Sequence, residues 1–338
     1  MTLNADKTKV AQASGAEKKA GAGWAAIAGK LGTFFGLVFV FVLFSVLRPQ
    51  TFLSFDNIEL ILLQTAVVGT AALGMTMIIV AGGIDLSVGS NIALCTVAIA
   101  LLMSHNVPWP VAALGGIVAG SLCGLFISVL ITQLKLSPFI VTLGMWGALR
   151  GMAKGFASDT TVLAPITPLN GLLRLLTPEE HWKLFPPGVW LMLVLALGVS
   201  AMLRYTRFGR HIFAIGSNEQ TARLCGVAVE RTKLLIYTLG AAFVGVAGVL
   251  QFSYLTVGDP TTANGYELQA IAAVVIGGAS LNGGQGSILG SILGALIMTT
   301  ISNGCTKLDL QNWVQEIVTG AIIVFAVALD RFRHKTSA

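Results

Sequence analysis

Hydrogen-bonding side chains gather at a break in an otherwise apolar stretch of the sequence. The apolar run 58–81 stops at Gly82 and Gly83, and a second apolar run covers residues 92–103. The residues at the break supply a carboxylate, two hydroxyls and an amide, from Asp85, Ser87, Ser90 and Asn91. These groups can donate hydrogen bonds to a hydroxylated solute and accept bonds from it.

An apolar run interrupted in this way is typical of a discontinuous membrane helix. An unpaired backbone group in hydrocarbon costs several kcal/mol, so a break persists only where protein buries it or where it lines a cavity. We therefore predict that Gly82 to Asn91 border a pathway for a polar solute. Asp85 has a second, more ordinary interpretation, as the cap of a helix that begins near Val88, worth about 1 kcal/mol.

A second break has the same pattern. Residues 276–285 align with residues 81–90 at an offset of 195, with identities at three glycines and one leucine. Asn282 and Gln285 supply the polar side chains of this second break. Paired interrupted segments in the two halves of a chain are typical of transporter binding sites. The two segments therefore predict an internal repeat, and we include Asn282 and Gln285 in the pathway.

Composition indicates that most of the surface faces lipid. Of the 338 residues, 55% are hydrophobic and 11% are charged, against about 25% charged in soluble proteins. The net charge of +6 arises from separate basic clusters without interleaved aromatic residues, which argues against nucleic-acid binding. The four cysteines and four histidines are widely spaced, so we expect no disulfide and no metal site.

The elements that position the breaks are predicted membrane helices, so the fold class is an all-α polytopic membrane protein. About 20 apolar residues cross the bilayer, and ten segments qualify, some of which can be half-helices: 31–47, 57–81, 88–104, 109–133, 137–156, 188–203, 233–255, 266–282, 284–302 and 312–329. Basic residues gather on one side of this arrangement, which predicts both termini in the cytoplasm. Ten spans satisfy that orientation, and eight would too.

The remaining segments lie at the two membrane surfaces. We predict a disordered cytoplasmic tail over 1–30, a permease domain over 31–330 and a second cytoplasmic tail over 331–338. The segment 157–188 is the longest external one. Two charged residues near the external side are expected at the interface, since Arg150 can extend its side chain to water and Glu267 opens the span 266–282.

The cytoplasmic loop 205–233 is longer than a simple turn requires. Ser217 or Asn218 can cap a short helix that ends at Gly226, with Glu219 and Arg223 one turn apart. Those two side chains can pair with each other, and the loop then only reverses the chain. Its length favours docking to a partner protein.

Several sequence blocks of the chain resemble one family. They are Gly83-Ile84-Asp85-Leu86-Ser87-Val88-Gly89-Ser90, Ala214-Ile215-Gly216-Ser217-Asn218-Glu219, Gly265-Tyr266-Glu267-Leu268 and Leu281-Asn282-Gly283-Gly284. In this order they resemble the permease subunits of ribose-, xylose- and arabinose-type ABC sugar importers, and more distantly branched-chain amino acid permeases. The resemblance covers about residues 47–330.

This resemblance implies a homodimer in the cell inner membrane that imports a monosaccharide, with a pentose such as ribose as the expected cargo. A coupling helix would dock on a cytoplasmic ABC ATPase through residues Gly216, Asn218, Glu219, Arg223 and Gly226. A periplasmic sugar-binding protein would deliver the sugar. The ATPase would hold ATP and Mg²⁺, because the chain has no phosphate-binding motif; the chain itself would bind no cofactor.

Two other functions fit the same sequence less well. An ion-gradient-driven secondary sugar transporter would use Asp85 or Glu267 as its ion site. A membrane scaffold would only recruit partners through the loop 205–233. An enzyme is not expected, because the sequence has no Gly-x-Ser-x-Gly or His-Glu-x-x-His motif.

Overall fold

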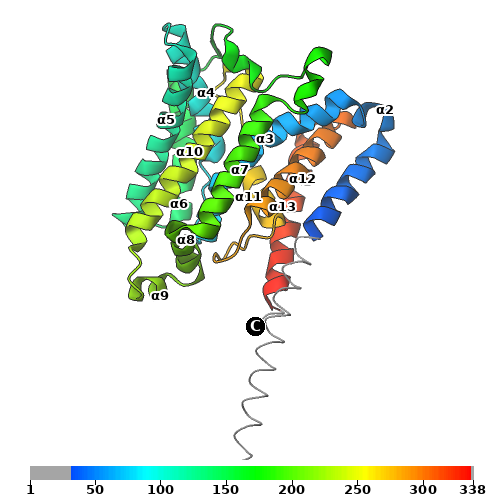
Figure 1. Ribbon diagram of the computed structural model, residues 1–338. Coiled ribbons are helices and arrows are strands. Elements are labelled where there is room, and N and C mark those ends of the chain that lie inside the picture. Colours follow the sequence, from blue (N-terminus) through cyan, green and yellow to red (C-terminus); the bar gives the residue numbers. More distant parts are fainter. Residues whose placement is uncertain (1–31, 336–338) are drawn as a thin grey trace, which may run out of the picture.

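The computed structural model describes residues 32–335, and Figure 1 shows their arrangement. The predicted tail 1–30 and the last residues of the second tail lie outside the described part. The first helix is Gly32–Leu47. The other α-helices are α2 Pro49–Phe52, α3 Phe55–Val80, α4 Val88–Ser104, α5 Trp109–Thr132, α6 Pro138–Phe156, α7 Pro187–Tyr205, α8 Arg207–Ser217, α9 Glu219–Leu224, α10 Val229–Leu255, α11 Tyr266–Ile276, α12 Ile288–Lys307 and α13 Asn312–Lys335.

Helix α3 is the central helix of the bundle. Ser54 caps it by accepting a hydrogen bond from the backbone N–H of Asn57, and α3 packs against α7, α10, α11 and α12. A side chain on Gly74 would overlap the backbone of Gly240 on α10, so small residues let the two helices approach closely. Nearly all residues in the apolar length of α3 are buried. The first break therefore follows a helix that protein surrounds on every side.

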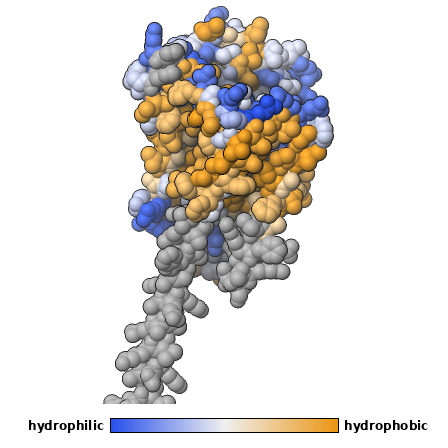
Figure 2. Space-filling view, turned by 90° about the vertical axis from the view of Figure 1, so that its right-hand side faces the viewer, coloured by the Kyte–Doolittle hydropathy of each residue, from blue (hydrophilic) through white to orange (hydrophobic). Residues whose placement is uncertain are grey.

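Apolar side chains form a belt around the molecule. Figure 2 shows this belt on one face, with hydrophilic residues gathered above it. Residues such as Phe35 and Phe39 of the first helix are 64% and 67% exposed. Within residues 32–335, five helices are long and apolar enough to cross a membrane, namely α3, α5, α7, α10 and α12. The fold is thus the predicted polytopic bundle, whose belt faces lipid.

The two spans beside the second break have other bounds than predicted, and the first of them is one of the half-helices that the sequence allowed. Instead of a span over 266–282, α11 ends at Ile276 and has 11 residues, a length of ~16 Å against the ~30 Å of the hydrocarbon core. Likewise α12 begins at Ile288 instead of 284. Gly278, Gly283 and Gly284 have positive φ angles of 90°, 85° and 74°, so these glycines turn the chain out of the helix.

The two ends of the bundle carry different connections. At one end lie β1 Val162–Leu163, η1 Pro168–Gly171 and η2 Pro178–Lys183, and β1 pairs antiparallel with β2 Val257–Gly258. At the opposite end lie α8 and α9, seen at the bottom of Figure 1. The segment predicted as external and the loop predicted as cytoplasmic are therefore at opposite ends of the molecule.

Candidate functional site

The first break is a tight turn held by Asp85. The buried Asp85 Oδ1 accepts hydrogen bonds from the backbone N–H of Ser87 at 2.8 Å and from its Oγ at 2.6 Å. Ser87, whose side chain makes no capping bond, is the N-cap residue of α4. The interpretation of Asp85 as the cap of α4 is thus wrong. Its carboxylate organises the turn that precedes the helix.

Two neighbouring helices hold this turn in place. Gly83 is buried, and a side chain at this position would overlap the hydroxyl of Tyr237 on α10. The Thr142 hydroxyl on α6 donates a hydrogen bond to the Ile84 carbonyl at 3.2 Å. The neighbouring Gly82 has a φ of 81°, a conformation that favours glycine. The break is therefore a defined structure, fitted to α6 and α10.

The two breaks meet each other. The backbone N–H of Gly284 donates a hydrogen bond to the carbonyl of Val80 at 2.8 Å, where α3 ends. Asn282 and Gln285 are exposed beside this contact. The repeat predicted from the sequence thus brings its two interrupted segments together at the end of the bundle that carries α8 and α9.

The C-terminal end of α8 packs against both breaks. A side chain on Gly216 would overlap the carbonyl of Val80 and come close to the N–H of Gly284, and a Cβ on Gly283 would lie 2.7 Å from the Gly216 carbonyl oxygen. We call Val80, Gly216, Gly283 and Gly284 the glycine junction. Because only backbone atoms fit there, a displacement of α8 must displace the breaks or open the junction.

Helix α9 confirms the predicted short helix outside the bundle. The Asn218 side chain accepts a hydrogen bond from the Thr221 N–H at 2.8 Å, and Gly226, after the end of the helix, has a φ of 83°. Glu219 forms ion pairs with Arg223 at 3.4 Å and with Lys233 at 2.6 Å.

A third ion pair and one apolar side chain complete the surface of α9. Arg223 pairs with Glu230 at 2.5 Å, and this contact raises the pKa of Arg223. Leu224 at the end of α9 is 88% exposed. The helix thus presents a charged network beside an apolar tip.

The remaining candidate residues of the first break have separate surroundings. Asn91 donates from Nδ2 to the carbonyl of Gly120 at 3.3 Å, so its amide ties α4 to α5. Ser90 is fully buried, and its Oγ has no hydrogen-bond partner in the described structure. The eight candidate pathway residues therefore do not line one common pocket. Asp85 and Ser87 shape a turn, Asn91 joins helices, and Asn282 and Gln285 lie at the exposed end.

Two charged residues are placed differently from their prediction. Instead of extending to water, Arg150 donates from Nη1 to the carbonyls of Pro260 at 2.9 Å and Thr262 at 2.7 Å. Instead of lying at the interface, Glu267 is 7% exposed, with its carboxylate against Gly89. Gln251 of α10 is also buried, and the sequence analysis did not single it out. The signal that could have found it is a polar amide within the apolar run 233–255.

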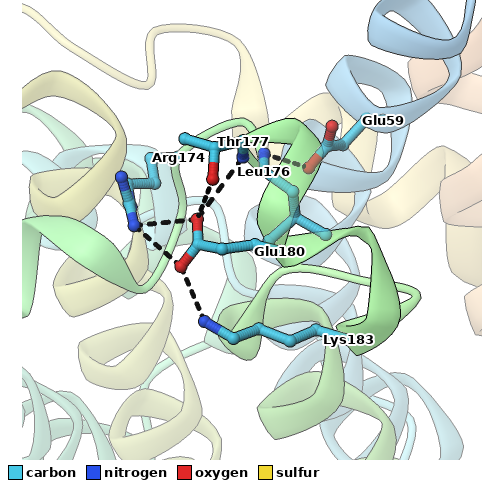
Figure 3. Close-up of polar contacts among 6 residues, drawn as sticks. All are labelled: Glu59, Arg174, Leu176, Thr177, Glu180 and Lys183. Carbon is cyan, nitrogen blue, oxygen red and sulfur yellow. Dashed lines mark hydrogen bonds and ion pairs between the residues drawn. The ribbon is translucent and has the colours of Figure 1, made fainter.

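The segment 157–188 is tied to the bundle by Glu59 and held together internally by Glu180, as Figure 3 shows. Glu59 of α3 accepts a hydrogen bond from the Leu176 N–H at 2.7 Å. Glu180 pairs with Lys183 at 2.7 Å and with Arg174 at 2.9 Å. The hydrogen bond from Lys183, with those from Thr177 and the charge of Arg174, lowers the pKa of Glu180 to about 2. The segment is therefore an ordered cap.

Comparison with known proteins gives consistent matches over most of the chain. Residues 57–327 match a family described as "Branched-chain amino acid transport system / permease component". The ribose import permease protein RbsC of Escherichia coli K12 is 36% identical over 87% of this chain and 91% of its own length.

Two further relatives cover a similar share. RbsC of Bacillus subtilis is 38% identical over 89% of this chain and 92% of its own length. The D-allose transport system permease protein AlsC of Escherichia coli K12 is 34% identical over 90% of this chain and 93% of its own length. No solved structure matches the chain.

Proposed function

Because the chain belongs to the family of branched-chain amino acid transport system permease components, we propose that it is the permease subunit of an ATP-driven importer of a monosaccharide. The relatives named for ribose and allose transport support a sugar as cargo. The observation that carries the mechanism is the glycine junction, where α8 touches both helix breaks. It offers a route by which an event at α9 alters the membrane pathway.

The docking partner at α9 is a cytoplasmic ATPase, which holds the ATP and Mg²⁺. The exposed Leu224 beside the ion pairs of Glu219 and Arg223 supports this role, because an apolar anchor within a polar rim is typical of protein interfaces. At the opposite end, the ordered cap offers a surface for an external sugar-binding protein. The excess of basic residues on the α8–α9 side supports cytoplasmic termini and an inner-membrane location.

The second copy in a homodimer packs on α6. Gly144, Gly147, Gly151 and Gly155 lie on this helix, and a Cβ added to any of them meets no atom within 4 Å. Neighbouring apolar residues are also exposed, such as Ile140, whose side chain is 67% exposed. Small residues at such spacings let membrane helices pack closely, so this open face suits a second α6.

The solute pathway passes the first break and leaves at the second. Gly82, Gly83, Asp85 and Ser87 shape the narrow part. Ser90 and Asn91 follow it into α4, and the exposed Asn282 and Gln285 lie at the cytoplasmic exit. Polar groups at these positions suit a solute that must shed bound water while crossing.

Uptake in cells tests the proposed cargo and its driving force. A strain without its own pentose and hexose importers would express this chain with a candidate ATPase and binding protein. We expect accumulation of radiolabelled ribose, xylose or allose that depends on both partners and continues after an ionophore is added. Uptake that stops with the ionophore but needs no ATPase would instead indicate a gradient-driven transporter.

A further inference from the structure

The connection between α10 and α11 enters the protein beside α4. A Cβ on Gly258 would meet the side chain of Ala100, whereas the carbonyl of Ala263 lies against Gly89. From Ala100 to Gly89 is ~16 Å along the helix, so residues 258–263 descend through more than half of α4. This non-helical backbone lies deep in the bundle, where only protein or a polar cavity can satisfy it.

Two polar side chains hold this descending segment. Arg150 donates from Nη1 to the carbonyls of Pro260 and Thr262. Gln251 donates from Nε2 to Thr262 Oγ1 at 2.8 Å. Both side chains use only part of their hydrogen-bonding capacity in these contacts.

Four buried polar atoms around this segment have no partner in the described structure. They are Ser90 Oγ, Arg150 Nη2, Gln251 Oε1 and Glu267 Oε2. Ser90, Gln251 and Glu267 are 0%, 3% and 7% exposed. An unsatisfied buried polar group is costly, and so many in one region require an explanation.

The four atoms belong to one neighbourhood. Glu267 Oε2 lies against Gly89, which precedes Ser90, and Arg150 and Gln251 both bind Thr262. Arg150 and Glu267 are oppositely charged residue types, but their two unpartnered atoms do not bond to each other. A small molecule with several hydroxyls can bridge such groups, since the guanidinium donates, the amide oxygen and carboxylate accept, and the hydroxyl does both.

We propose that Ser90, Arg150, Gln251 and Glu267 form a transient binding site for the hydroxyl groups of a neutral monosaccharide on its way to the first break. One positive and one negative side chain leave the set without net charge, which favours a neutral solute over an ion. The inference rests on the proposed function, because it assigns the sugar contacts of the same pathway. Ordered water alone is the competing occupant.

A panel of deoxy sugars tests this site. The variants Ser90→Ala, Gln251→Leu and Glu267→Gln would be reconstituted with the ATPase and one sugar-binding protein. Uptake of ribose would be compared with that of its 2-deoxy and 3-deoxy derivatives, and the same binding protein in every assay cancels its own selectivity. Gln269→Leu is the control. It replaces the same residue type as Gln251→Leu, but on the side of α11 that faces away from Glu267.

A sugar contact predicts an uneven response across the panel. Loss of one hydrogen bond to a charged group should slow ribose uptake about tenfold, while the derivative lacking the matching hydroxyl should be slowed less than about threefold. An equal reduction for every sugar in all three variants would overturn the site and leave only a structural or water-binding role. Ser90→Ala keeps the test valid if the larger changes prevent folding, because the Ser90 Oγ bonds to none of the described residues.

The wild-type chain separates the two claims. Absence of ATP-dependent uptake of any sugar would contradict the proposed function itself. If the wild-type chain takes up sugar and each variant slows all the sugars equally, only the proposed site is contradicted.

Discussion

At the scale of single residues, Gly83 and Tyr237 determine how closely the first break approaches α10. We expect Gly83→Ala to destabilise the protein by about 1–3 kcal/mol, because its methyl group would overlap the Tyr237 hydroxyl. The larger Gly83→Leu should abolish uptake. Thermal unfolding in detergent and uptake into proteoliposomes measure the two effects.

Tyr237→Phe should partly rescue the Gly83→Ala variant. The Tyr237 hydroxyl is buried and has no hydrogen-bond partner among the described residues, so its removal should cost little on its own. Together with Gly83→Ala it should restore part of the lost stability. If the two substitutions are simply additive, the overlap is not the cause of the damage.

Glu180 makes the cap sensitive to acid. Its pKa in the folded protein is about 2, below its usual value of 4.5, so its bonds stabilise the cap above about pH 4.5 and are lost as pH falls toward 2. We expect pepsin to cleave the segment Leu176–Lys183 only near the bottom of this range.

Two neighbouring variants check the assignment to Glu180. Glu180→Gln should make the cap sensitive to pepsin already at pH 4, because the amide cannot form the ion pairs with Arg174 and Lys183. Glu179→Gln is the control on an exposed neighbour. Equal cleavage of all three proteins at pH 4 would show that Glu180 does not hold the cap.

At the scale of elements, the glycine junction connects α8 with both breaks. Gly216→Ala should destabilise the protein by about 1–3 kcal/mol and reduce the sugar imported per ATP, since the methyl group meets backbone atoms that cannot rotate away. Gly198→Ala on α7 is the control, as its methyl group has open space and should stabilise by about 0.5–1 kcal/mol. An unchanged transport ratio in Gly216→Ala would disprove coupling through the junction.

Helix α9 carries the proposed contact with the ATPase. Glu219→Arg or Arg223→Glu should leave the chain in the membrane, because exposed ion pairs contribute only about 0–1 kcal/mol. Sugar uptake per ATP hydrolysed should nevertheless fall, since the charged rim around Leu224 is reversed. Normal coupling in both α9 variants would refute the docking assignment.

At the scale of the whole molecule, the open face of α6 predicts how two copies assemble. Gly147→Leu should weaken the dimer, because the side chain fills the space that a second helix would occupy. Gly198→Leu makes the same change on the exposed side of α7 and should leave the dimer intact. Native mass spectrometry of the detergent-solubilised protein distinguishes the two results, and a stable Gly147→Leu dimer would exclude this face.

The helical architecture could be predicted from the sequence because long apolar runs and helix caps are local signals. The spans at α3, α4 and α5 and the short helix at α9 required only runs of neighbouring residues. The end of α11 could be predicted less exactly, since the apolar pattern continues to Leu281 although the backbone turns at Gly278. A glycine permits such a turn without requiring it.

The candidate site was harder to predict because its contacts join residues far apart in the chain. The bond between Gly284 and Val80 and the packing of Gly216 against both depend on how four helices assemble. Arg150 has the sequence context of an interfacial residue, but the carbonyl groups that it binds belong to the segment before α11. Only the tertiary structure reveals such partners.

The most direct measurement of the central claim is sugar uptake by purified components in proteoliposomes. ATP and the ATPase would be placed on the α8–α9 side of the membrane, and the loaded binding protein on the side of the cap. We predict that radiolabelled sugar moves toward the ATP-containing side and that the movement stops when either ATP or the binding protein is omitted. Sugar movement at the same rate without ATP would contradict the account.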